Sequence, residues 1–146
     1  MTDSERLNAA RWTLKIGLGV GPIVTGFDKF FNKLTDWSMY LSPLATKIVP
    51  VSGATLMHVV GVVEIVAGLV VLSRWTRIGS TIVMLWLLAI AINLVTTGMF
   101  YDLAMRDVEI ALGAFVLSQL CAVHGARESV QVSQPTAPGF GSAGTR

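Results

Sequence analysis

The chain has 146 residues, of which 53% are hydrophobic and 14% are charged, and its mean hydropathy is +0.65. These values exclude an ordinary soluble domain and indicate an integral membrane protein. The net charge of +2 comes from basic residues that are scattered along the chain, so we interpret them as topology signals and expect no nucleic-acid partner. The single cysteine, Cys121, excludes an intramolecular disulfide and a dithiol redox centre.

The amino-terminal part of the chain predicts a long first helix. Thr2 and Glu5 stand at capping-box spacing, which is typical of a helix start. The stretch from Trp12 to Phe31 is long enough to cross a bilayer, and it lacks a preceding signal-peptide cleavage site, so we expect it to stay as an anchor. Gly17 and Gly21 form a GxxxG pair, which is expected to let a neighbouring helix approach closely.

Residues 32–53 predict an interfacial loop between the first and second membrane helices. They contain too few apolar residues for another crossing, and Trp37 and Tyr40 favour the level of the lipid headgroups. Asp36 to Leu41 can form a short helix on the membrane surface. The sequence leaves open whether this loop simply rests at the interface or covers the helices as a lid.

Three further apolar runs have the length of membrane helices: Ala54 to Ser73, Ile78 to Tyr101, and Leu103 to about Val123. Together with the first helix they predict an all-α fold, a four-transmembrane-helix bundle with up-down-up-down topology. We expect residues 1–127 to form this membrane domain. Residues 128–146 are rich in Ser, Thr, Pro and Gly, which predicts a disordered cytoplasmic tail.

The distribution of basic residues predicts the orientation of the bundle. One side would carry Arg6, Arg11, Lys15, Arg74, Arg77, Arg127 and Arg146, and the other Lys29, Lys33, Lys47 and Arg106. Because the more basic side of a membrane protein faces the cytoplasm, we expect both termini there.

Polar residues within the predicted helices suggest a site. A lone carboxylate at the bilayer centre costs on the order of 3 kcal/mol, so Glu64, near the middle of the second span, must be paired, protonated or facing water. The expected topology places other polar groups in the same outer half of the membrane: His58, Lys29, Asp28, Asn93, Arg106, Asp107 and Glu109. We therefore predict a polar pocket centred on Glu64.

This set of residues has two interpretations. In the first, Lys29 or Arg106 pairs with Asp28, Asp107 or Glu64 and holds the helices in register. In the second, the residues form a site for a quinone headgroup, for another small polar ligand, or for proton transfer, since desolvated ionisable groups gather at such sites.

His58 is either a metal or proton-relay ligand or a hydrogen-bonded histidine at the interface. It lies about 120° around an ideal helix from Glu64, so the two are expected to contact different neighbours. A bis-histidine haem is excluded because His58 and His124 belong to opposite ends of the bundle. No Glu-x-x-His pair is present, so we expect no metal site.

Parts of the sequence resemble the DoxX family of small four-helix bacterial membrane proteins. The resemblance lies in Gly26 to Lys29 at the end of the first span, in Gly61 to Gly68 around Glu64, and in Arg106 with Asp107 at the start of the fourth span. It implies a multi-pass protein of the bacterial inner membrane. Relatives of that kind are membrane subunits in thiosulfate-to-quinone electron transfer or partners of redox enzymes.

The resemblance implies no catalytic residues and no covalently bound cofactor, and we expect a quinone-linked subunit rather than an independent enzyme. Its partners would be the lipid bilayer and a redox enzyme or further copies of the chain. Two alternatives stay open: a small proton or solute carrier that uses Glu64 and Lys29, and a purely structural membrane anchor.

Overall fold

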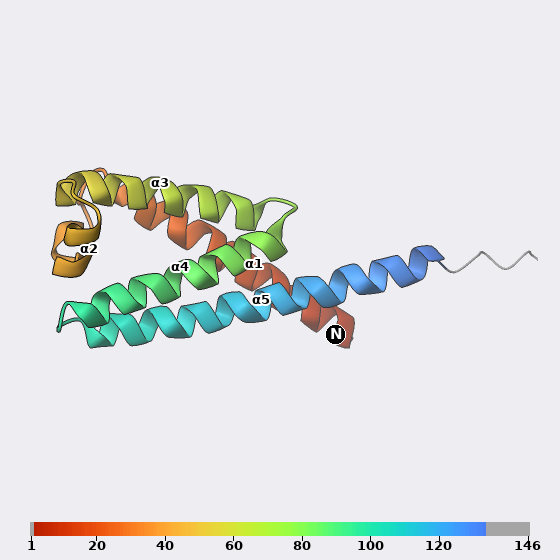
Figure 1. The fold of residues 1–146 in the computed structure, drawn as a ribbon. Coiled ribbons are helices and arrows are strands. Elements are labelled where there is room, and N and C mark those ends of the chain that lie inside the picture. Colours follow the sequence, from red (N-terminus) through yellow and green to blue (C-terminus); the bar gives the residue numbers. More distant parts are fainter. Residues whose placement is uncertain (1, 134–146) are drawn as a thin grey trace, which may run out of the picture.

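The computed structural model describes residues 2–133 (Figure 1), and all regular structure in this range is helical. The elements are α1 (Asp3–Asp28), the 3-10 helix η1 (Trp37–Tyr40), α2 (Pro43–Ile48), α3 (Gly53–Leu72), α4 (Thr76–Thr96) and α5 (Tyr101–Ser133). Helices α3 and α4 and the first 26 residues of α5 are long and apolar enough to cross a membrane. The described part of the chain is therefore all-helical, and its apolar helices indicate a membrane protein, as the composition predicted.

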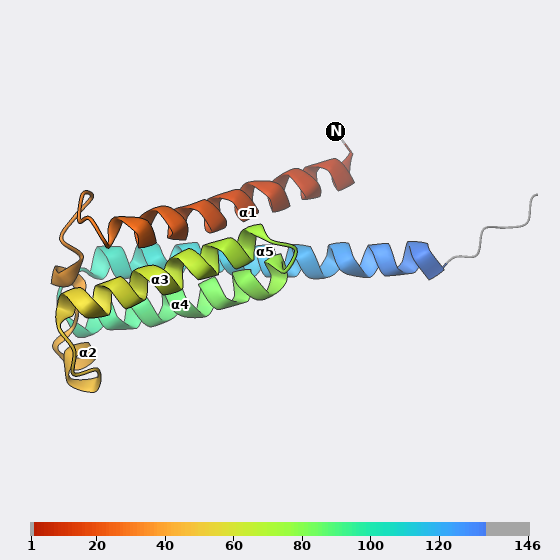
Figure 2. The ribbon, with the colours of Figure 1, turned by 90° about the horizontal axis from the view of Figure 1, so that it is seen from above.

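The four long helices alternate in direction along the chain. Helix α1 packs on α3, α4 packs on α5, and the contact of α3 with α4 joins these two hairpins. Figures 1 and 2 show that the amino-terminal end of α1 and the carboxyl-terminal end of α5 lie at the same end of the bundle, and that η1 and α2 lie at the opposite end. The long helices thus alternate up and down as predicted, while among the described residues three of them meet the length and apolarity of a membrane span.

Helix α1 begins at the predicted capping box. The Thr2 hydroxyl accepts the Glu5 backbone N–H at 3.3 Å, and the Glu5 carboxylate accepts the Thr2 backbone N–H at 2.6 Å. These two bonds satisfy amide groups that have no partner within the helix. Helix α1 ends at Asp28, and the chain then turns through Asn32. Asn32 has a φ of 50°, a backbone conformation that asparagine tolerates better than most residues do.

Two pairs of glycines bring α1 and α3 into close contact. A Cβ atom added at Gly26 would lie 2.6 Å from the carbonyl oxygen of Gly61, and one added at Gly68 would collide with the carbonyl oxygen of Gly19. These obstacles are backbone atoms, which cannot rotate away. The absence of side chains at these positions therefore sets the distance between the two helices.

The prediction that Gly17 and Gly21 mediate this approach is wrong. A Cβ atom at either position would meet no atom within 4 Å. The GxxxG spacing identifies a face of α1 with small residues, but the rotation of α1 is set by its packing on α3. That packing turns Gly19 and Gly26 toward α3 instead.

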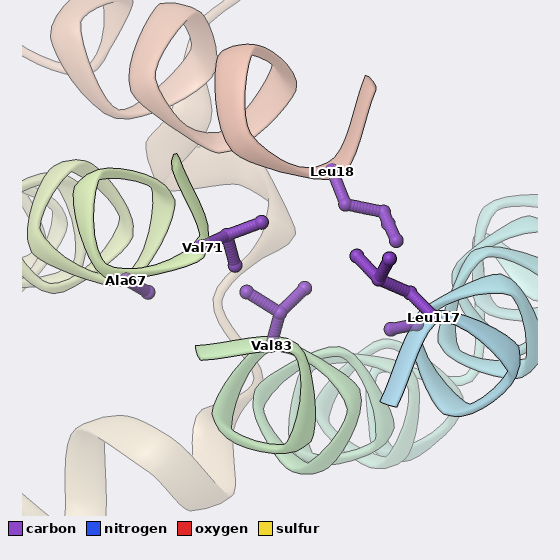
Figure 3. Packing of buried hydrophobic residues seen from close by; sticks show 6 residues of the cluster. Leu18, Ala67, Val71, Val83 and Leu117 are labelled. Atoms are coloured by element: carbon purple, nitrogen blue, oxygen red, sulfur yellow. The ribbon is translucent and has the colours of Figure 1, made fainter. Parts of the chain in front are cut away.

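The apolar core joins all four long helices. Its fully buried residues include Val71 from α3, Val83 from α4 and Leu117 from α5, and Leu18 from α1 completes the cluster (Figure 3). Because all four long helices contribute to this cluster, it holds them together as one bundle.

Helix α4 ends earlier than the predicted third span. The apolar run continues to Tyr101, but the helix stops at Thr96 and Gly98 adopts a φ of +74°. The Gly98 N–H donates to the carbonyl oxygen of Val95 at 3.1 Å, as in a glycine-terminated helix. Phe100 also has a positive φ of 59°, which is uncommon for a bulky residue and marks a tight turn into α5.

Helix α5 is longer than the fourth span predicted from hydropathy. It continues to Ser133, so residues 128–133, which were predicted to begin a disordered tail, are helical. Within this last part, Ala126, Arg127, Glu128 and Gln131 have good helix propensity, and the charged residues make the segment less apolar than a membrane span. The rest of the predicted tail, residues 134–146, lies outside the described residues.

The loop after α1 contains the short helix predicted near Asp36 to Leu41, which is the 3-10 helix Trp37–Tyr40. A second short helix, α2, was not predicted. The Ser42 hydroxyl accepts the Ala45 N–H at 3.0 Å, and Pro43 occupies the first helical turn. Both features are common helix-start signals.

Candidate functional site: a buried ion pair between α1 and α3

The centre of the candidate site is an ion pair between Lys29 and Glu64. The Lys29 Nζ atom lies 2.6 Å from Glu64 Oε2, and the two side chains are only 5% and 9% exposed. Thr25, one turn earlier in α1, donates its hydroxyl to the same carboxylate oxygen at 3.4 Å. A buried charge is costly unless it is paired and hydrogen-bonded, and this arrangement meets both conditions.

The glycine contact positions the pair. Gly61 lies one helical turn before Glu64, and a Cβ atom there would come within 3.2 Å of the Lys29 Cβ atom. Gly26 approaches the Glu64 Cβ atom from the other helix, at 3.0 Å from an added Cβ. The close approach of α1 and α3 therefore brings the two charged side chains together without a neighbouring side chain between them.

Trp37 covers the ammonium group of Lys29. The Nζ atom lies 3.7 Å from the centre of the indole ring, which is a cation–π contact. The indole Nε1 donates to Asp28 Oδ2 at 2.8 Å. Asp28 also accepts the backbone N–H groups of Lys33 at 3.1 Å and Leu34 at 3.0 Å. Asp28 thus fixes the loop and the ring, and the ring in turn covers the ion pair.

Trp86 in α4 supplies a further polar group. Its indole interacts with the Glu64 carboxyl group, but its buried Nε1 atom completes no hydrogen bond within the described part of the chain. Buried polar groups are nearly always hydrogen-bonded in proteins, so a donor that interacts with Glu64 without completing a hydrogen bond has capacity for an acceptor.

Asp107 in α5 belongs to the electrostatic surroundings of the pair. It is buried, and Lys29 attracts it through a Coulombic interaction. Its ion-pair partner is Arg106, whose guanidinium nitrogen lies 3.6 Å away on a side chain that is 61% exposed. Charged groups from α1, α3 and α5 thus share one region of the bundle.

The other predicted site residues lie apart from this pair. His58 is exposed and stacks on Phe30, with ring centroids 5.0 Å apart, and Glu109 is exposed on α5. Asn93 holds the loop instead, because its amide donates to the Tyr40 carbonyl at 2.7 Å and accepts the Ser42 N–H at 3.2 Å. His58 and Glu64 contact different neighbours, as their spacing predicted.

The start of η1 is held by Asp36. Its carboxylate accepts the Ser38 hydroxyl at 2.6 Å and the Ser38 N–H at 3.1 Å. These hydrogen bonds favour the charged carboxylate and hold the pKa of Asp36 below its ordinary value. The loop that carries Trp37 is therefore best ordered when Asp36 is ionised.

Sequence reasoning identified Lys29, Glu64 and Asp28 but missed three of their partners. Thr25 and Trp86 were not assigned to the site, and Trp37 was taken only as an interfacial residue. Trp37 is nine residues from Asp28, and Trp86 comes from another helix. The rotation of α1 and α4 and the path of the loop after α1 place these side chains on the pair, and no local sequence pattern specifies either of them.

Within residues 2–133, no group of three or more His, Cys, Asp or Glu side chains is arranged to hold a metal ion. The chemistry of the site rests instead on hydrogen-bond donors and one carboxylate. Lys29 and Trp86 can donate to an acceptor oxygen, and Glu64 can hold or release a proton.

Comparison of the chain with protein-family models, with curated proteins and with solved structures finds no match in any of the three. The likeness to the DoxX family thus consists of the short motifs quoted above. The structure gives those motifs a physical role in this chain, because Gly26 contacts Gly61 and Lys29 pairs with Glu64.

Proposed function

We propose that the chain is a DoxX-like membrane subunit of a quinone-linked redox complex, and that the Lys29–Glu64 pair is its quinone-headgroup site. The observation that carries the proposal is a buried ion pair beside a buried indole N–H that interacts with Glu64 but completes no hydrogen bond among the described residues. A quinone has two carbonyl oxygens, which accept hydrogen bonds and need donors in an apolar setting. Lys29 and Trp86 are donors of this kind.

In the proposed reaction, this chain and a partner enzyme together reduce a quinone. Reduction of a quinone to a quinol takes up two electrons and two protons. A partner redox enzyme supplies the two electrons. The two protons come from water, each taken up by the Glu64 carboxylate before it is passed to a carbonyl oxygen, while Lys29 stabilises negative charge on these oxygens. Phe27 near the end of α1 and Phe31 in the turn after it are 60% and 61% exposed, and they offer an apolar surface along which the ring and its isoprenoid tail approach.

The proposed topology includes α1 as a fourth crossing. Helix α1 has 26 residues, enough for about 39 Å of helix, and it packs along α3, which is itself long and apolar enough to cross. With the more basic end of the bundle inside, both termini face the cytoplasm of a bacterium and the ion pair belongs to the outer half of its plasma membrane. The partner docks on this subunit or on a homo-oligomer of it.

The test is the binding of decylubiquinone and of a menaquinone analogue to the purified protein in nanodiscs, followed by quenching of tryptophan fluorescence and by photolabelling with an azidoquinone. Glu64→Gln and Trp86→Phe should each weaken binding about tenfold, the effect of about one hydrogen bond to a charged or buried group. Glu109→Gln, at an exposed carboxylate on α5, is the matched control and should leave binding unchanged. Equal affinity in all four proteins would refute the proposal.

A second candidate is a proton or solute carrier. The burial of Asp107 within electrostatic reach of Lys29 favours it, because it extends the charged groups from α1 and α3 to α5. In that case proteoliposomes should show a flux that Glu64→Gln abolishes. An unchanged flux would exclude transport through Glu64. A structural anchor would show neither quinone binding nor flux, and its Glu64 variants would lose only stability.

A further inference from the structure

A groove lies at the end of the bundle opposite η1, where α3 turns into α4. It has a volume of about 520 Å³ and is lined by Arg74, Trp75, Arg77, Ile78, Thr81 and Ile82. The groove is separate from the Lys29–Glu64 pair, and neither of its arginines has a role in the proposed quinone chemistry.

The groove residues form one stripe along the start of α4. Arg77, Ile78, Thr81 and Ile82 recur at spacings of three and four, so they share a face of the helix, and Arg74 precedes them by three residues. Because α4 begins at Thr76 and is one of the apolar spans, the stripe runs from charged residues at the membrane boundary to exposed isoleucines one turn deeper.

The two guanidinium groups lack anionic partners in the part of the chain that the structure describes. The ion pairs found there join Lys29 to Glu64 and Arg106 to Asp107. The Arg74 guanidinium lies 5.7 Å from the centre of the Trp75 ring, and Trp75 is 57% exposed. Two unpaired cations beside an exposed tryptophan form an electropositive surface at the level where lipid phosphates lie.

We propose that this groove binds an anionic phospholipid. Its phosphate lies between Arg74 and Arg77, which donate charge-assisted hydrogen bonds to the phosphate oxygens. Trp75 flanks the glycerol region, and one acyl chain lies along Ile78 and Ile82. A free phosphate would satisfy the arginines but would leave the apolar half of the stripe uncovered, which is why we assign the site to a lipid.

The experiment measures lipid binding to the full chain in a neutral detergent. Phosphatidylglycerol with dibrominated acyl chains is titrated while tryptophan fluorescence is followed, and brominated phosphatidylcholine serves as the uncharged-headgroup reference. The wild type should bind phosphatidylglycerol about tenfold more tightly than phosphatidylcholine, because each basic residue near an anionic surface adds to the attraction. The Trp75→Phe variant should lose most of the quenching.

The double variant Arg74→Gln, Arg77→Gln should lose the preference for phosphatidylglycerol. The matched control Lys33→Gln, Lys47→Gln removes the same charge from exposed lysines at the other end of the bundle and should keep it. The double variant Arg74→Lys, Arg77→Lys keeps the charges and should keep part of the preference for phosphatidylglycerol. This variant distinguishes a loss of binding from a loss of folding. An equal loss in the glutamine variant and its control, or no preference in the wild type, would overturn the proposal. So would displacement of the lipid by inorganic phosphate but not by sodium chloride of equal ionic strength.

Discussion

Lys29 and Glu64 meet at a distance of 2.6 Å, one helical turn beyond the place where Gly26 and Gly61 bring α1 and α3 into contact. The glycines and the charged residues therefore act together. Without the close approach the two side chains would not reach one another inside the bundle, and without the pair the interior would hold an unpaired charge.

The first prediction concerns the contribution of this ion pair to the stability of the protein. Lys29→Met and Glu64→Leu should each lower the free energy of unfolding by about 3 kcal/mol, because each leaves one buried charge without its partner. The double variant should recover most of that loss, since a pair of apolar side chains carries no desolvation cost. Reversible unfolding in detergent micelles measures all four proteins. Additive losses in the double variant would mean that the side chains do not interact.

The second prediction concerns the glycine contact. Gly26→Ala and Gly68→Ala should destabilise the protein by about 1 to 3 kcal/mol, because the added methyl groups meet backbone oxygens of the opposite helix. Gly17→Ala and Gly21→Ala are the matched controls, because they make the same substitution at glycines of α1 that do not contact α3. Since nothing lies within 4 Å of their Cβ positions, they should be neutral or slightly stabilising. Thermal unfolding of the four variants ranks them, and a cost at Gly17 equal to that at Gly26 would contradict the observed rotation of α1.

The features that could be predicted from the sequence are mostly those that depend on residues close together in the chain. Capping at Thr2 and Glu5 is local, so α1 begins where expected. The pairing of Lys29 with Glu64 was among the few ion pairs predicted, because the apolar chain contains few charged residues. Because burying an unpaired charge is costly, Glu64 was expected to pair with one of the few basic residues near it.

The rest depended on information that is not local. The rotation of α1 follows from its contact with α3, so the spacing of Gly17 and Gly21 was misleading. The end of α4 depends on one glycine with a positive φ, Gly98, inside an unbroken apolar run. The extent of α5 could not be inferred from hydropathy, because a helix and a membrane span need not have the same length.

A third prediction separates the two roles of Trp37. Trp37→Phe keeps an aromatic face over Lys29 but loses the hydrogen bond from Nε1 to Asp28, whereas Trp37→Leu loses both. We expect Trp37→Leu to be the less stable, by about 1 kcal/mol, which is the usual size of a cation–π contact. Unfolding by denaturant in micelles measures the difference. Equal stability of the two variants would show that the ring face contributes nothing.

A fourth prediction concerns the attachment of the loop. Asn93→Leu removes both hydrogen bonds from α4 to Tyr40 and Ser42, so backbone amides of the loop should exchange with solvent about tenfold faster. Hydrogen exchange followed by mass spectrometry resolves this segment. Thr96→Ala, which removes only a bond within α4 itself, is the control and should not change exchange in the loop. If it does, the effect belongs to α4 as a whole.

A fifth prediction concerns pH. Hydrogen bonds from Ser38 lower the pKa of Asp36, so their stabilisation of η1 is present above the ordinary pKa of an aspartate and is lost as the pH falls through the lowered value. An NMR titration of the Asp36 carboxyl carbon should give a pKa below that measured in the Ser38→Ala variant. The same pKa in both proteins would exclude the hydrogen bond from the Ser38 hydroxyl as the cause.

The most direct test of the proposed role uses a protein in which the pair is absent but the fold is kept. The Lys29→Met, Glu64→Leu double variant is placed in nanodiscs, and its affinity for decylubiquinone is compared with that of the wild type. The account predicts normal thermal stability with quinone binding reduced at least about tenfold. Undiminished quinone binding by this stable double variant would contradict it.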